Sequence, residues 1–293
     1  MRCRELFVLV VVLVCFCVCD LFAGMDQIFN DGLVHNIVTH INYGNVLMYD
    51  SSSGGATTIN LRSKGGIEND VYMYGNSILN VRDGYINHDL YAYGNSKIWL
   101  KTGYIGELWT PDKYVRLYDN SELLMTGGRI DYCLYTYDNS RVSITDGINW
   151  DVRTYDYSKM NISGGEIDAV FAARDYSDVT ITGGFFKNLA GLDDSSVTMS
   201  GGDIEGIIRV CNDSTITFFG QDFTLNGKSV GYGEYHASEF LKDGRITGKL
   251  LNGDQLDNEL MMLHSGKIIL AVPEPCSVLL FGLGAVGLWR RSR

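Results

Sequence analysis

Apolar and polar residues alternate in short runs that recur along the middle of the chain. In the run from Ser177 to Thr182, Val179 and Ile181 point to one side and Thr180 and Thr182 to the other. This alternation is typical of a half-buried β-strand. Two glycines follow the run and permit a turn with positive φ. The pattern therefore predicts short strands that are separated by glycine turns.

The same unit recurs at a nearly constant interval. Each copy begins with a serine, the anchor, and successive anchors lie 19, 25, 19, 18, 19, 18 and 19 residues apart. A glycine follows seven residues after each of the first seven anchors. A coil of this length cannot close its own core, so it must stack on its neighbours. The anchors are Ser77, Ser96, Ser121, Ser140, Ser158, Ser177, Ser195 and Ser214.

The repeat predicts an all-β fold, a single-stranded parallel β-helix (a solenoid) that we expect to be right-handed. Apolar residues two positions after each anchor form a predicted core column: Leu79, Ile98, Leu123, Val142, Met160, Val179, Val197 and Ile216. The anchor serines share the parity of this column. We therefore expect their hydroxyls to face inward and to bond each other or the backbone.

The chain divides into five segments on this interpretation. Residues 1–23 are a signal peptide, 24–56 an N-terminal cap, 57–220 the repeats, 221–271 a C-terminal β cap, and 272–293 a sorting signal or anchor that contains a short apolar helix. The single interval of 25 residues holds an insertion near Glu107–Asp112. This insertion is either a functional loop or a tolerated addition.

The N-terminus has the features of an export signal. A basic start is followed by an apolar run of 13 residues from Leu6 to Val18, which is short for a membrane-spanning helix. We expect cleavage after Ala23 and passage through the Sec machinery. An uncleaved anchor is the alternative.

The C-terminus combines a rigid motif, an apolar run from Cys276 to Trp289 and a basic end. The residues concerned are Val272, Pro273, Glu274, Pro275, Arg290, Arg291 and Arg293. This order resembles the PEP-CTERM sorting signal of Gram-negative bacteria, and residues 221–271 loosely resemble planctomycete-type repeat proteins that carry it. The resemblance implies an exosortase, a membrane transpeptidase, as partner. It also implies transient membrane anchoring through this segment and a final location at the cell surface or outside the cell. An ordinary membrane anchor is the alternative.

Composition narrows the range of partners. The net charge of −11 argues against nucleic acid, because a phosphate backbone would repel such a surface. Only Cys133 and Cys211 lie between the two end segments, which is too few for a disulfide framework or a cysteine metal site. The 34 glycines and 3 prolines agree with a β-rich repeat.

A column of acidic residues lies two positions before five of the anchors. Its members are Asp119, Asp138, Asp156, Asp175 and Asp193. Stacked carboxylates repel each other, so something must offset the repulsion. One hypothesis is a Ca²⁺-binding face. We favour the other, in which each aspartate accepts a backbone N–H at its turn, so that no cofactor is needed.

A column of tyrosines lies three positions before the anchors. Its members are Tyr74, Tyr93, Tyr118, Tyr137 and Tyr155. Such a stripe can bind sugar rings, or it can be a packing ladder, which we favour.

No set of residues with the spacing of a catalytic motif stands out. The five histidines fall on no common column. We therefore expect an exported structural or binding protein without enzymatic activity, associated with exopolysaccharide through weak, repeated contacts. The alternative is a polysaccharide lyase or hydrolase that uses the aspartate column and the Trp109 insertion.

Overall fold

The computed structural model describes residues 25–106, 113–237 and 243–272. The predicted signal peptide, the Glu107–Asp112 insertion and the predicted C-terminal helix lie outside these residues. The chain divides into two compact units, one ending at Lys159 and one beginning at Met160. The described part contains strands and no α-helix, and the predicted all-β solenoid is confirmed.

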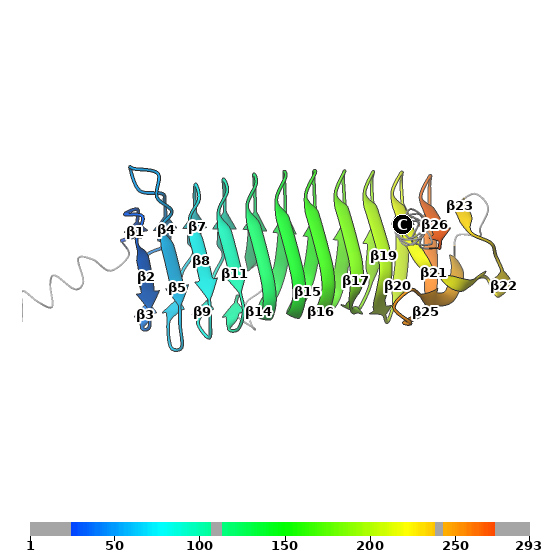
Figure 1. Cartoon of the computed structure of the whole chain (residues 1–293), viewed down its shortest axis with the longest axis horizontal. Helices are drawn as coiled ribbons and strands as arrows, with labels where there is room; N and C mark the ends of the chain where they lie inside the picture. The colour runs from blue at the N-terminus through cyan, green and yellow to red at the C-terminus, as the bar shows by residue number, and fades with distance from the viewer. Residues whose placement is uncertain (1–24, 107–112, 238–242, 273–293) are drawn as a thin grey trace, which may run out of the picture. The chain divides into compact units, whose positions relative to one another are not determined.

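Unit 1 consists of coils with three strands each, stacked in parallel (Figure 1). The first side of the coils contains β1 (Gln27–Phe29), β4 (Val46–Met48), β7 (Val71–Met73), β10 (Leu90–Ala92) and β13 (Tyr114–Leu117). The second side contains β2 (Val34–Ile37), β5 (Thr58–Leu61), β8 (Ile78–Val81) and β11 (Lys97–Leu100). The third side contains β3 (His40–Ile41), β6 (Gly66–Ile67), β9 (Tyr85–Ile86) and β12 (Tyr104–Ile105). The long strands β14 (Glu122–Thr136) and β15 (Arg141–Thr154) each run along all three sides.

The register of unit 1 follows the repeat read from the sequence. Leu79 pairs with Ile98, and Ile98 pairs with Leu123 across the longer interval. All three side chains are at most 2% exposed, so the predicted core column is confirmed in this unit. The first five anchor serines are also fully buried, as their parity predicts.

A glycine is required where each coil turns between its second and third sides. Gly103 has φ +89°, and a Cβ at this position would lie 2.1 Å from the carbonyl oxygen of Gly84. Neighbouring coils thus approach too closely for a side chain. This explains the glycine seven residues after the anchor.

Residues 27–41, within the predicted N-terminal cap, form the first coil. Its strands pair in parallel with the second coil, with Gln27 opposite Val46 and His35 opposite Ile59. Gln27 and His35 thus place polar side chains in columns that are apolar in later coils. Polar residues are suited to this end layer of the core, because no further coil covers its outer side within the described residues.

Unit 2 begins within β16 (Lys159–Ala173) and continues the same coil pattern. Its parallel strands are β17 (Asp178–Phe186), β18 (Leu189–Gly191), β19 (Ser196–Ile204), β20 (Ile207–Cys211) and β21 (Thr215–Leu225). Val179 pairs with Val197 and Val197 with Ile216, all fully buried.

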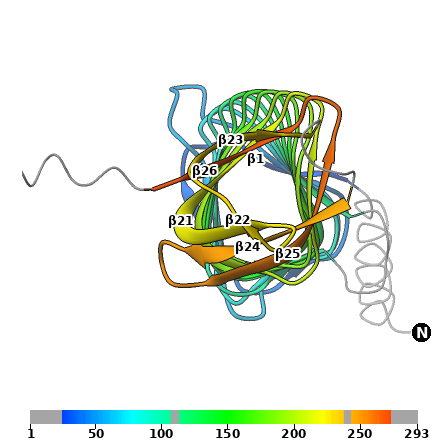
Figure 2. The same ribbon diagram turned by 90° about the vertical axis from the view of Figure 1, so that its right-hand side faces the viewer.

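The last coil of unit 2 is assembled from distant parts of the chain. β25 (Gln255–Leu263) and β26 (Lys267–Ala271) pair in parallel with β20 and β21. Their outer edges pair antiparallel with β24 (Asp243–Leu250) and β23 (Gly233–His236), while β22 (Lys228–Ser229) folds back on β21. Figure 2 shows these strands in front of the coils of unit 2. The segment predicted as a C-terminal β cap thus contributes both one more coil and its cover.

In residues 25–106, 113–237 and 243–272, no helix has the length and apolar character needed to cross a membrane.

Candidate functional site

The aspartate column occupies the turn before each anchor. All five aspartates have positive φ, between 52° and 60°, a conformation that Asp and Asn adopt more readily than most residues. In unit 1 the Oδ2 atoms of Asp119 and Asp138 accept the N–H of Gly94 and Asp119, respectively, at 2.8 and 2.9 Å. Asp156 accepts the N–H of Asp138 at 3.0 Å. These carboxylates therefore cap the turn of the preceding coil, as the favoured hypothesis predicts.

The same aspartates do not form a compact metal cage in the described structure. Among residues 25–106, 113–237 and 243–272, no three His, Cys, Asp or Glu side chains are grouped closely enough to hold an ion. In unit 2, Asp193 accepts a hydrogen bond from the side chain of Asn212 at 2.9 Å. A Ca²⁺-binding face therefore stays a prediction, with one oxygen of each of Asp119, Asp138 and Asp156 already used by the backbone.

The tyrosine column of unit 1 forms a continuous ring stack. We call it the tyrosine stack: Tyr49, Tyr74, Tyr93, Tyr118, Tyr137 and Tyr155. Successive ring centroids are 4.8, 5.2, 5.0, 4.9 and 4.9 Å apart, and successive rings are within 10° of parallel. Thr57 is buried at the place in its coil that the anchor serine Ser77 takes in the next. Sequence analysis missed Tyr49 because seven residues separate it from Thr57, whereas two separate each other tyrosine of the stack from its anchor. The Val46-x-Met48 pattern before it, which matches Val71-x-Met73 before Tyr74, was the available signal.

Stacking determines what the tyrosines can offer to a ligand. Each inner ring has a neighbour on both faces, so only ring edges and hydroxyl groups can reach solvent. Burial raises the pKa of Tyr74, Tyr93 and Tyr118, and raises that of Tyr137 to about 12. The hydroxyls therefore remain neutral and able to donate hydrogen bonds at physiological pH. A sugar would meet hydroxyl groups here and not an open ring face.

A second outward column runs beside the tyrosine stack on the first side of the coils. We call it the tyrosine–arginine column: Tyr72, Tyr91, Arg116, Tyr135 and Arg153. Tyr72 and Tyr91 stack at 4.9 Å, and the Arg116 guanidinium lies 5.3 Å from the Tyr91 ring centroid. Sequence analysis did not recognise this column or the two arginines in it.

Both arginines of this column are already partnered. Arg116 donates to the Tyr91 hydroxyl at 2.8 Å and lies 3.7 Å from a carboxylate oxygen of Asp89. Arg153 donates twice to Asp151, at 3.1 and 2.7 Å. Burial and the hydrogen bond to Asp89 raise the pKa of Tyr91. Internal contacts thus neutralise most of the charge of this column.

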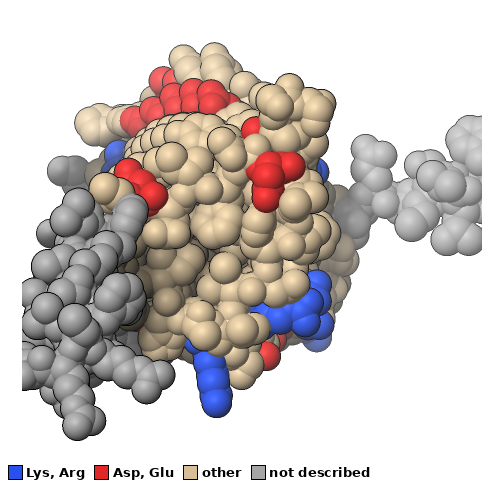
Figure 3. Space-filling model, turned by 90° about the vertical axis from the view of Figure 1, so that its left-hand side faces the viewer, with Lys and Arg blue, Asp and Glu red and all other residues tan. Residues whose placement is uncertain are grey.

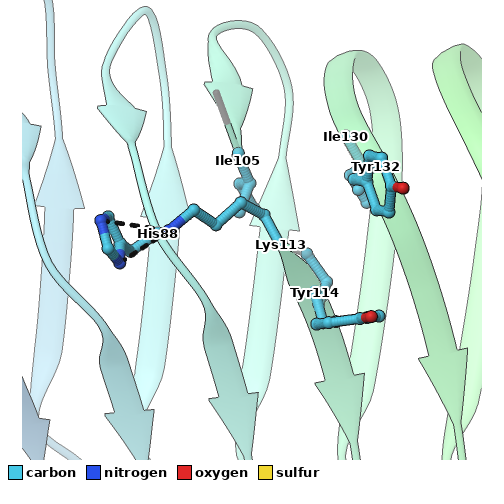
Figure 4. A pocket seen from close by; sticks show the side chains of 8 residues that line it. His88, Ile105, Lys113, Tyr114, Ile130 and Tyr132 are labelled. Atoms are coloured by element: carbon cyan, nitrogen blue, oxygen red, sulfur yellow. Dashed lines mark hydrogen bonds between the residues drawn. The ribbon is translucent and has the colours of Figure 1, made fainter. Parts of the chain in front are cut away.

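A small pocket lies on unit 1 between His88, Ile105, Lys113, Tyr114, Ile130 and Tyr132 (Figure 4). The Lys113 ammonium is 3.0 and 3.1 Å from the two ring nitrogens of His88. The space between the side chains leaves no room for a water molecule. It is therefore a packed contact, although it borders the predicted insertion, which lies outside the described residues.

One acidic pair was not recognised in the sequence. The hydrogen bond between Glu166 and Asp168 in unit 2, together with the negative charge of Asp168, raises the pKa of Glu166. Two carboxyl groups two residues apart on a strand face the same side, and this spacing was the available signal.

Comparison with known proteins identifies the C-terminal segment. Residues 271–293 match the PEP-CTERM protein-sorting motif. The motif implies a protein that is exported and sorted by an exosortase-type machinery. The match begins at Ala271, the final residue of β26, so the PEP-CTERM segment follows directly on the last strand of the solenoid. No curated protein and no solved structure matches the chain.

Proposed function

We propose that this protein is a non-catalytic display scaffold of the cell surface or extracellular matrix, released there by an exosortase and associated with exopolysaccharide. The observation that carries the proposal is the PEP-CTERM motif, which directly follows a β-solenoid whose outward side chains repeat once per coil. A regular surface of this kind offers many identical weak contacts to a polymer, and such contacts add up through multivalency.

The bonding of the outward columns supports display over catalysis. The carboxylates of Asp119, Asp138 and Asp156 each accept a backbone N–H, and Arg153 is bound to Asp151. These groups stabilise the coils. The neutral hydroxyls of the tyrosine stack, by contrast, are suited to hydrogen bonds with sugar hydroxyls.

Export and processing can be tested on the protein from its native host. We expect it outside the cell, with an intact mass that lacks the leader before Gly24 and the tail after Pro275. A full-length tail in the membrane fraction would contradict exosortase release and indicate an anchored surface protein. Retention in the cytoplasm would overturn the proposal as a whole.

The association with polysaccharide needs a separate test. We expect the mature protein to co-sediment with purified host exopolysaccharide and to be released by excess soluble polymer. A protein that stays in the supernatant at every polymer concentration would refute this part of the proposal. Release of reducing sugar during the incubation would instead indicate an enzyme.

A further inference from the structure

One outward column of unit 1 carries cations on three consecutive coils. We call it the cationic column: Arg62, Arg82 and Lys101, each of which directly follows a strand of the second side. The N–H of Arg82 bonds to the carbonyl of Leu61, and that of Lys101 bonds to the carbonyl of Val81. The three residues are therefore in register, one coil apart.

Within the described residues, these cations form no ion pair. All three side chains are exposed, and no carboxylate within the described ranges forms an ion pair with them. Asp83, the nearest carboxylate in sequence, forms none. Like charges directly opposite on neighbouring strands destabilise a sheet, and at one coil of about 4.8 Å the repulsion is appreciable. An anionic ligand would relieve it.

Beside the cationic column, on the same face, lies a ladder of asparagines. The Nδ2 atom of Asn60 donates to Asn36 at 3.1 Å, and the Nδ2 atom of Asn80 donates to Asn60 at 2.8 Å. The ladder ends at the Oδ1 atom of Asn80, which accepts no hydrogen bond from the described residues and is buried, since Asn80 is only 6% exposed. A buried acceptor without a donor is costly, so this atom marks a place where a ligand hydroxyl can bind.

An exposed indole completes the face. Trp99 lies opposite Asn80 in register on the next coil and is 45% exposed. Its ring offers an apolar surface to the C–H face of a sugar, and a rotation of the ring would open the Asn80 oxygen to a hydroxyl group. Figure 3 looks onto the end of unit 1 that carries the first coil, where Lys and Arg side chains appear mainly at the lower right of the view.

We infer that the cationic column, Asn80 and Trp99 form a binding site for a linear polysaccharide of acidic sugars, such as a polyuronate. This inference rests on the proposed association with polysaccharide and specifies its ligand class. Neighbouring coils lie about 4.8 Å apart, which is close to the length of one sugar ring, so carboxylates along an acidic glycan can reach cations along the column. The hydroxyl groups of a sugar can bond to the asparagine ladder, and its apolar ring face can pack on Trp99. Nucleic acid is a poorer ligand, because the net charge of −11 repels its phosphates.

The test uses the mature protein and two polymers with the same backbone: polygalacturonate and its methyl ester, in which the charge is removed. We expect polygalacturonate to bind, the ester to bind far more weakly, and salt to weaken the binding. The double variant Arg82→Glu/Lys101→Glu should raise the Kd at least about tenfold. The matched control Lys228→Glu/Lys249→Glu reverses two exposed charges of unit 2 that do not lie opposite each other and that form no ion pair with a described residue, and it should leave the Kd unchanged.

A second variant probes the uncharged part of the site. Trp99→Ala should weaken binding while the salt dependence stays that of the wild type, and binding should shift the tryptophan fluorescence of the wild type. Circular dichroism and thermal melting confirm that each variant is folded. If a variant does not fold, Arg82→Gln/Lys101→Gln or Trp99→Phe replaces it.

The outcomes separate this inference from the proposed function. Equal binding of polygalacturonate by both charge variants, equal binding of the ester, or tighter binding of single-stranded DNA would each overturn the inference. If the protein binds host exopolysaccharide but not polygalacturonate, the acidic-sugar site is wrong and the proposed function stands. If it binds neither polymer, both fail.

Discussion

The corner of the coil next to each anchor serine is stabilised differently in the two units. Three positions before each anchor, unit 1 has tyrosines that stack on each other, whereas unit 2 has Arg174, Leu192 and Cys211. In unit 1 the hydroxyl oxygens of four anchors, Ser77, Ser96, Ser121 and Ser140, are buried and form no hydrogen bond with the described residues. In unit 2 the anchor hydroxyls bond to the backbone.

The serine bonds of unit 2 are regular. The Oγ atoms of Ser195 and Ser214 each accept the N–H of the residue three positions earlier at 3.1 Å. They also donate to the carbonyls of Ala173 and Gly191 at 3.0 and 2.9 Å. The expectation that all anchor hydroxyls bond each other or the backbone was therefore wrong for the four in unit 1. One repeat motif stabilises its corner through ring stacking in one unit and through hydroxyl bonds in the other.

Removing a ring from the middle of the stack should have the largest effect. Tyr118→Ala loses two stacking partners and should lower the free energy of unfolding by about 3 kcal/mol. Leu192→Ala, at the equivalent position of unit 2, should cost only about 1 kcal/mol, because Leu192 is half-buried. Urea unfolding measures both, and Tyr118→Phe, which keeps the ring, is the control. Equal losses for the two alanine variants would show that the stack adds nothing to stability.

Replacing a turn aspartate should have the next largest effect. Asp138→Ala loses the acceptor for the Asp119 N–H and places alanine at φ 56°, which together should cost about 2 kcal/mol. Asp138→Gly tolerates the φ and should cost about half as much. Asp193→Ala should cost less than Asp138→Ala, because its carboxylate accepts from a side chain and not from the turn. Thermal melting of the three variants ranks them, and a harmless Asp138→Ala would contradict the capping role.

The serine hydroxyls provide the most direct comparison between the units. Ser214→Ala removes bonds to Cys211 and Gly191 and should cost about 1–2 kcal/mol. Ser121→Ala removes a buried hydroxyl without a partner and should be neutral or slightly stabilising. Urea unfolding measures the free energy of unfolding of both variants. A loss at Ser121 as large as that at Ser214 would mean that a water molecule or another group satisfies the unit 1 serines.

The smallest effect concerns pH. Burial and neighbouring carboxylates raise the pKa of Tyr72 and Tyr85 to about 12, above the ordinary value of 10.0. A raised pKa means that the folded state keeps its phenolic proton after the unfolded state has lost it. The stability contributed by these tyrosines is therefore complete below pH 10 and is lost as the pH rises toward 12. Ultraviolet titration of phenolate, with and without denaturant, checks this, and identical curves would contradict it.

The repeat made much of the fold predictable from sequence. Ser, Gly and Asp recur once per coil, and each is needed by the local backbone geometry, so spacing alone located the coils and their core columns. The same regularity identified five members of the tyrosine stack. The calcium face and the glycan stripe remain predictions, because their ligands leave no mark on the backbone.

Features outside the regular interval could not be predicted. The asparagine ladder begins at Asn36 in the first coil and the tyrosine stack at Tyr49 in the second, where loop lengths vary and no anchor serine marks the register. The pairing of β25 with β20 depends on contacts across about 50 residues, which turn signals such as Asn252-Gly253 do not encode. The bonding of the serine hydroxyls depends on side-chain rotamers, which an identical motif leaves open.

The late closure of unit 2 has a consequence for the order of folding. β26 ends at Ala271, where the sorting motif begins, and the last coil needs both β25 and β26 in place on strands made much earlier. Loops of this length are slow to close, so this coil is expected to form late. For the expected export from the N-terminus, the final coil is complete only once β26 has followed, immediately ahead of the sorting segment. The last coil is therefore completed at the same stage of export as the sorting motif arrives.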